Sequence, residues 1–93
     1  MGGSPQEGFE YGAVLAKIVE CVSPYLGQTM AEASVEAQRQ RLGIDDSRLA
    51  ADQVEALITR IGVGLVIFVG RDKTAQIVRQ IQDSVHSLSG GTS

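Results

Sequence analysis

The sequence predicts an all-α fold, a compact bundle of about four helices over residues 9–22, 24–42, 50–61 and 71–88. Apolar side chains recur at spacings of three and four residues in these segments, which is the period of one helix face. Glycine or proline separates the segments, as is typical of helix boundaries. A single segment, 63–69, has the composition of a strand, and the chain offers no second strand to pair with it.

Length and composition indicate one small acidic domain. A chain of ninety-three residues buries only a small core relative to its surface. We expect residues 9–88 to form the domain, and the Gly- and Ser-rich ends, 1–8 and 89–93, to be disordered tails. The net charge is −3 and no basic stripe is present. Nucleic acid and an anionic membrane surface are therefore not expected as partners.

Cysteine usage and hydropathy favour a cytoplasmic location. Cys21 is the only cysteine, so an internal disulfide is excluded. The opening residues 1–4 have neither the basic nor the apolar region of a signal peptide. The longest fully apolar run, 65–69, has five residues, whereas a membrane-spanning helix needs about 20.

A break at Pro24 separates the first two predicted helices. The first, 9–22, carries Val14, Ile18 and Cys21 on one face. Proline in a helix interior loses a hydrogen bond and clashes with the preceding turn. At the first position of a new helix it is favoured, and Ser23 is a suitable N-cap. We therefore expect a break or sharp kink here, with a second helix that starts at Pro24.

The second helix has a well-marked end. Arg39 and Arg41 lie in its last turn, where positive charge complements the helix dipole. Gly43 and Ile44 follow in the order that a Schellman motif requires. These two arginines, together with Arg48, are also candidate contacts for an acidic partner.

The third helix, 50–61, has two possible starts. With Ala50 as the N-cap, Gln53 stands at N3, and Leu49 and Val54 form a hydrophobic staple. A cap within the polar residues 45–47 would start the helix a turn earlier. The sequence leaves both open.

Glycines mark the two ends of the apolar segment. We expect Gly62 to end the third helix. Extending the periodicity of 71–88 backward places Arg71 on the buried face, which predicts a fresh helix start near Gly70.

The apolar segment 63–69 has three interpretations. It is a short buried helical or 3₁₀ segment, an extended connector through the core, or a strand that pairs with its copy in a homodimer; we favour the first. Five adjacent apolar residues point in every direction around a helix, and one small bundle cannot cover them all. Some of Val66, Ile67, Phe68 and Val69 should then form an exposed patch, which usually marks an interface.

Asp46-Ser47 resembles the modification site of acyl and peptidyl carrier proteins. These are small acidic four-helix domains that attach phosphopantetheine to the Ser of an Asp-Ser-Leu motif at a helix start. Arg48 stands in the Leu position here. The resemblance covers two or three residues and implies a carrier modified at Ser47.

The other motifs give little support for a catalytic or ligand-binding site. Residues 70–74 lack the Lys-after-Gly order of a phosphate-binding loop. Glu32 and Glu36 form an i, i+4 pair that is typical of a solvated helix face. Cys21 and His86 are far apart in the sequence, so no metal, catalytic or cofactor site is predicted. The sequence favours a non-enzymatic interaction or regulatory module that binds protein, including its own copy; a small ligand-binding domain is a further alternative.

Overall fold

The computed structural model describes residues 8–44 and 48–90. These contain three helices and two short strands, in the order β1 (Phe9–Glu10), α1 (Tyr11–Leu26), α2 (Gln28–Arg41), β2 (Arg48–Leu49) and α3 (Ala51–Gly90). The all-α prediction is confirmed, whereas the count of four helices is wrong. Most of the predicted tails, and the Asp46-Ser47 motif, lie outside the described residues.

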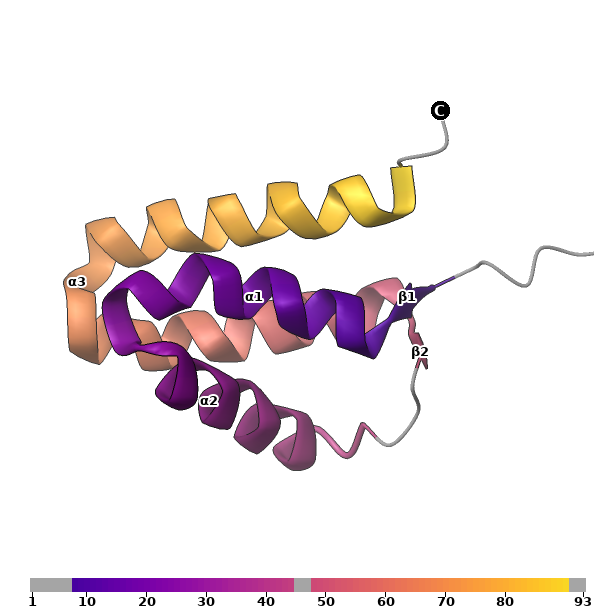
Figure 1. Ribbon diagram of the computed structural model, residues 1–93, viewed down its shortest axis with the longest axis horizontal. Helices are drawn as coiled ribbons and strands as arrows, with labels where there is room; N and C mark the ends of the chain where they lie inside the picture. The colour runs from indigo at the N-terminus through magenta and orange to yellow at the C-terminus, as the bar shows by residue number, and fades with distance from the viewer. Residues whose placement is uncertain (1–7, 45–47, 91–93) are drawn as a thin grey trace, which may run out of the picture.

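The three helices form a compact arrangement around α1. Figure 1 shows α3 folding back on itself, so that its two halves run in opposite directions, with α1 and α2 beside them. The bend of α3 lies at the end of the domain where α1 turns into α2. The described start of the chain and the end of α3 lie at the other end. The bend is therefore the exposed tip of the domain.

The predicted break at Pro24 is wrong, because α1 continues through Pro24 to Leu26. The proline removes one hydrogen bond, that of its own missing amide, and the helix continues past it. The chain turns instead at Gly27, whose φ of 87° favours glycine. The Gly27 amide donates to the Ser23 carbonyl at 2.7 Å, and its own carbonyl accepts from Ala31 at 2.9 Å.

Residues 9 and 10, predicted as helix, are strand β1. Phe9 pairs with Leu49 and Glu10 with Arg48 in an antiparallel ladder. Gly8 precedes it with a φ of 92°, and a Cβ there would lie 2.8 Å from the Leu49 carbonyl oxygen. The pairing ties the start of α1 to the start of α3.

The predicted stop of α2 is confirmed. Gly43 has a φ of 69°, and its amide donates to the Gln40 carbonyl at 3.1 Å. The Ile44 amide donates to the Arg39 carbonyl at 3.1 Å. These are the two bonds of the Schellman motif.

The structure places the start of α3 at the later of the two predicted positions. The Ala50 amide donates to Gln53 Oε1 at 2.8 Å, and the Ala50 carbonyl accepts from Val54 at 3.1 Å. Leu49 and Val54 are both buried, as a staple requires. Ala50 is thus the N-cap residue.

Gly62 does not end the third helix, and this prediction is wrong. Residues 63–69 continue it as α-helix, so the extended connector and the strand paired with its copy are both wrong. The segment is helical, as favoured, but it is not a separate short element and is not buried throughout. Gly62 is buried, and a Cβ there would lie 3.0 Å from Val78 Cγ2. Its role is close packing between the two halves of α3.

The predicted boundary at Gly70 coincides with the bend of α3. Gly70 has φ 82° and ψ 172°, values outside the helical region. This combination is accessible essentially to glycine alone. Gly70 therefore divides α3 into a first half, 51–69, and a second half, 71–90.

One apolar core joins all the helices. Its buried residues are mainly Ile, Leu and Val, as the low aromatic content predicts. They are Val14, Ile18, Cys21, Val22, Ala31, Val35, Ile44, Leu49, Val54, Leu57, Ile58, Ile61, Leu65, Ile77, Ile81 and Val85.

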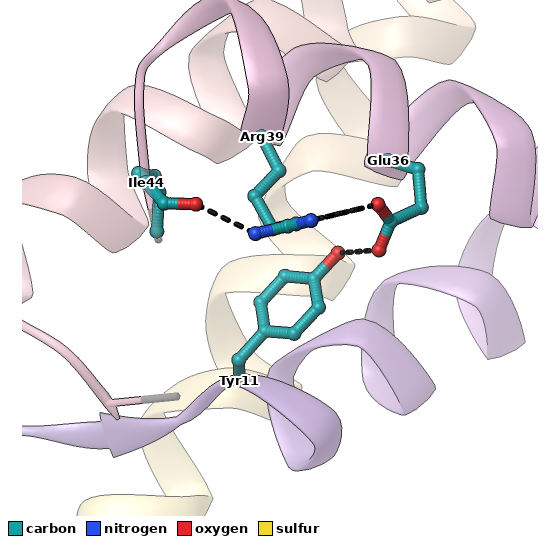
Figure 2. Close-up of polar contacts among 4 residues, drawn as sticks. All are labelled: Tyr11, Glu36, Arg39 and Ile44. Atoms are coloured by element: carbon teal, nitrogen blue, oxygen red, sulfur yellow. Dashed lines mark hydrogen bonds and ion pairs between the residues drawn. The ribbon is translucent and has the colours of Figure 1, made fainter. Parts of the chain in front are cut away.

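A polar network fastens α2 to α1 (Figure 2). The Tyr11 hydroxyl donates to Glu36 Oε2 at 2.8 Å. Arg39 forms an ion pair with Glu36 Oε1 at 3.1 Å and donates to the Ile44 carbonyl at 2.6 Å. Its guanidinium also lies 5.2 Å from the centre of the Tyr11 ring. Arg39 therefore has a structural role, beyond the helix-end compensation expected of it.

Candidate interaction surface

Four large apolar side chains are exposed at the end of the first half of α3. The exposed fractions are 63% for Val63, 39% for Val66, 84% for Ile67 and 61% for Phe68. We call these four residues the elbow patch. Of the predicted partner-binding residues, Val66, Ile67 and Phe68 belong to it. Val69, the fourth, is half-buried and packs against the core.

The helical geometry explains why the patch faces solvent. Leu65 is 1% exposed and occupies the side of the helix that faces the core. Val63, Val66 and Ile67 are three and four positions apart, so they share another side. Recognising Val63 from the sequence required continuing the helix of 50–61 through Gly62.

Apolar residues of α1 and α2 lie near the elbow patch. Phe68 lines a small apolar cavity of about 50 Å³ together with Leu26 and Ala31. Tyr25, at the end of α1, is 44% exposed, and Met30, at the start of α2, is 50% exposed. Apolar surface therefore occurs on all three helices at this end of the domain.

Charged residues lie on both sides of the patch along α3. Arg71 and Lys73 follow the bend and are exposed. The Lys73 ammonium lies 5.9 Å from the centre of the Tyr25 ring. Toward the start of the helix, Asp52 and Glu55 are exposed. The first half of α3 thus has exposed carboxylates near its start and an apolar end, and a mixed charged run, Arg71, Asp72 and Lys73, follows the bend.

The contacts of the polar residues that were considered for catalysis favour structural roles for them. Cys21 is buried with its sulfur 3.9 Å from Ser84 Oγ, and burial raises the pKa of its thiol. This opposes formation of the reactive thiolate. Glu32 accepts a hydrogen bond from Gln28 at 3.2 Å. Hydrogen bonds from Arg39, and secondly from Tyr11, lower the pKa of Glu36. An elevated carboxyl pKa, which a general acid needs, does not arise at Glu36.

Residues considered for metal or cofactor attachment are not brought together. Among residues 8–44 and 48–90, no group of three or more His, Cys, Asp or Glu side chains is placed to hold a metal ion. His86 is exposed on the second half of α3. Ser47 is outside the described residues, and α3 starts only at Ala51, after strand β2. The motif is therefore separated from the nearest following helix.

By length and composition alone, Ala51–Leu88 of α3 is long and apolar enough to cross a membrane. The most apolar 18-residue window is 33% buried inside the domain. Core helices of soluble proteins pass the same test, so this is weak support for a membrane role. Most of that window is not buried inside the domain, in agreement with the exposure of the elbow patch.

Comparison of the chain with protein-family models, curated proteins and solved structures finds no match. The functional argument therefore depends on the chemistry of this surface.

Proposed function

We propose that this chain is a non-enzymatic protein–protein interaction module that self-associates through the elbow patch. The observation that carries the proposal is the exposure of Val63, Ile67 and Phe68, each more than half exposed on one helix end. Large apolar side chains that lie together on a surface usually mark an interface.

The amount of exposed apolar surface supports a modest interface. The four side chains of the elbow patch, with Tyr25 and Met30 nearby, expose on the order of 500 Å². A standard interface buries about 800 Å² per partner. Contact with a protein partner would remove the apolar area from water at roughly 25 cal/mol per Å². A reversible regulatory association fits this size better than an obligate one.

The experiment is sedimentation equilibrium of the wild type and Ile67→Asp. The wild type should associate as its concentration rises, and the variant should remain monomeric. Because Ile67 is 84% exposed, the variant should keep its helical circular dichroism and its thermal midpoint. Gln80→Asp, at an exposed position in the second half of α3, is the matched control. Wild-type protein that stays monomeric at every concentration would contradict self-association.

A further inference from the structure

Gly64 differs from Gly62 and Gly70 in that nothing within one copy of the chain requires a glycine there. A Cβ on Gly62 would lie 3.0 Å from Val78 Cγ2, and Gly70 has a φ of 82°. Gly64 has a helical backbone, and a Cβ there would meet no heavy atom within 4 Å. Glycine inside a helix is less favourable than alanine, and a common reason for it is close approach of another group to the backbone. The surface at Gly64 therefore has room for a group from outside the chain.

Gly64 borders a small apolar pocket next to the elbow patch. The pocket has a volume of about 50 Å³, and buried residues such as Val22 of α1 and Leu65 of α3 line it. Ser34, Gly64 and Phe68 also line it, and these three remain at least partly exposed. The pocket thus opens between α2 and the first half of α3, and Phe68 belongs both to its lining and to the elbow patch.

The pocket fits the end of one aliphatic side chain. Pockets that hold whole small molecules have volumes of about 300–1,000 Å³, several times the volume of this one. A buried water needs about two to four polar partners, and Ser34 provides the only polar side chain of the lining. None of the lining residues is charged. The chemistry and the size together favour an uncharged, branched apolar group.

The chain carries such a side chain beside its own pocket. Ile67 is 84% exposed, the largest exposed fraction among the large apolar residues that the structure describes. It is not part of the pocket lining of its own chain, and it lies three positions after Gly64, on the neighbouring surface of the helix. A twofold axis that passes close to Gly64 exchanges these two adjacent sites between copies. It would bring each Ile67 to the pocket of the other copy, and no side chain at Gly64 would hold the two helices apart.

We propose that two copies of the chain associate with Ile67 of each copy inserted into the pocket beside Gly64 of the other. This deepens the proposed function and rests on it. Filling the pocket adds buried apolar surface to the elbow patch, which alone exposes less than the about 800 Å² per partner of a standard interface. Side chains that insert into pockets at the centre of an interface contribute most of its affinity. Because each contact occurs twice, the assembly closes as a dimer.

Substitution of Gly64 separates this arrangement from a flat contact between elbow patches. Gly64→Ala should weaken the dimer about tenfold, because its methyl group lies between two closely packed helices. Gly64→Leu should abolish the dimer. The matched control is Gly12→Ala in the first turn of α1, where a Cβ also meets no heavy atom within 4 Å. It should leave the dissociation constant within twofold of the wild type. Sedimentation equilibrium measures the constants, and circular dichroism checks that each variant folds.

Thiol cross-linking tests where Ile67 lies in the dimer. The Ile67→Cys and Ser34→Cys variants are mixed and treated with bismaleimidoethane, a short reagent that joins two thiols. The mixed dimer, identified by its intact mass, should form at least tenfold faster than in a mixture of Gln80→Cys and Ser34→Cys. Cys21 is buried, and unmodified wild type treated in the same way measures its background reaction.

The outcomes distinguish failure of this arrangement from failure of the proposed function. A wild-type dimer that Gly64→Ala and Gly64→Leu leave unchanged, or equal cross-linking in the two mixtures, overturns the insertion of Ile67 but keeps self-association. A wild-type monomer at every concentration overturns both. If that monomer co-sediments with phosphatidylcholine vesicles and Ile67→Asp does not, the apolar surface binds lipid instead.

Discussion

The Tyr11 hydroxyl donates a 2.8 Å hydrogen bond to Oε2 of Glu36, a residue of the next helix. Glu36 in turn holds Arg39, which caps the Ile44 carbonyl beyond the end of α2. This contact joins the start of α1 to the last turns of α2, at the opposite end of the domain from the elbow patch. We expect this network to make the packing of α2 sensitive to pH in two separate ranges.

In alkaline solution, Tyr11 should control part of the loss of stability. Burial, and secondly the hydrogen bond to Glu36, raises the pKa of Tyr11 to about 12. An unfolded chain loses this proton near pH 10. Stability from this group is therefore complete below pH 10 and declines as pH rises to about 12. Tyr11→Phe should show a smaller decline in urea unfolding between pH 9 and 11.5. Equal declines in both proteins would contradict this role.

In acid, Glu36 should make the stability of the protein fall as the pH falls. Its pKa is lowered, chiefly by Arg39 and then by Tyr11. Its stabilising effect is therefore present above its ordinary pKa and is lost as pH falls through the lowered, folded-state pKa. We expect Glu36→Gln to be less stable than the wild type at pH 7 and to approach it at pH 3. A constant difference across that range would mean that the charge of Glu36 is unimportant.

A side chain should destabilise the fold at Gly70 but not at Gly64. The backbone of Gly70 has φ 82° and ψ 172°, and forcing alanine into it costs on the order of 1–3 kcal/mol. At Gly64, a Cβ meets no heavy atom within 4 Å. Alanine there should stabilise the helix by about 0.5–1 kcal/mol. Urea unfolding of Gly70→Ala and Gly64→Ala measures both. Similar effects in the two variants would refute a special backbone at the bend.

The variant Thr74→Val is expected to be more stable than the wild type. Its side chain is 6% exposed, and its Oγ1 is buried without a hydrogen-bond partner in the structure. Replacing an unsatisfied hydroxyl by a methyl group removes its desolvation penalty, so Thr74→Val should gain about 1 kcal/mol. The exposed Thr29→Val should change stability by less than about 0.5 kcal/mol. A loss of stability in Thr74→Val would contradict an unsatisfied hydroxyl at this position.

Two isoleucines of α3 should respond very differently to truncation. Ile81 is fully buried, whereas Ile67 is 84% exposed. Ile81→Ala should cost about 2–5 kcal/mol through lost burial and a cavity. Measured below the concentration of association, Ile67→Ala should change stability by less than about 0.5 kcal/mol. A large loss at Ile67 would place it in the core and remove the basis of the elbow patch.

Local signals in the sequence predicted the features that depend on a few neighbouring residues. The Schellman stop at Gly43 needs only the side chains and backbone freedom of one turn. At the start of α3 the same kind of signal left two positions open, of which the structure takes Ala50. The boundary at Gly70 could be predicted because Arg71 would otherwise face the core. The signal of Pro24 was misleading, because α1 accommodates the proline and the chain turns at Gly27 instead.

Long-range packing decided the rest. The two-residue strands have no sequence signal, because their pairing depends on bringing Phe9 to Leu49 across forty positions. Gly62 reads locally as a helix end, but its missing side chain instead admits Val78 from the other half of α3.

By itself, the sequence determined that this chain is helical, acidic and richer in apolar residues around 63–69 than a small core can bury. These properties follow from composition and periodicity, which act locally. Only the tertiary structure decided which of those apolar residues face solvent. The bend at Gly70 and the burial of Leu65 orient the helix so that Val63, Val66 and Ile67 point outward. That choice depends on which side of the helix the remaining helices cover, and no local pattern specifies it.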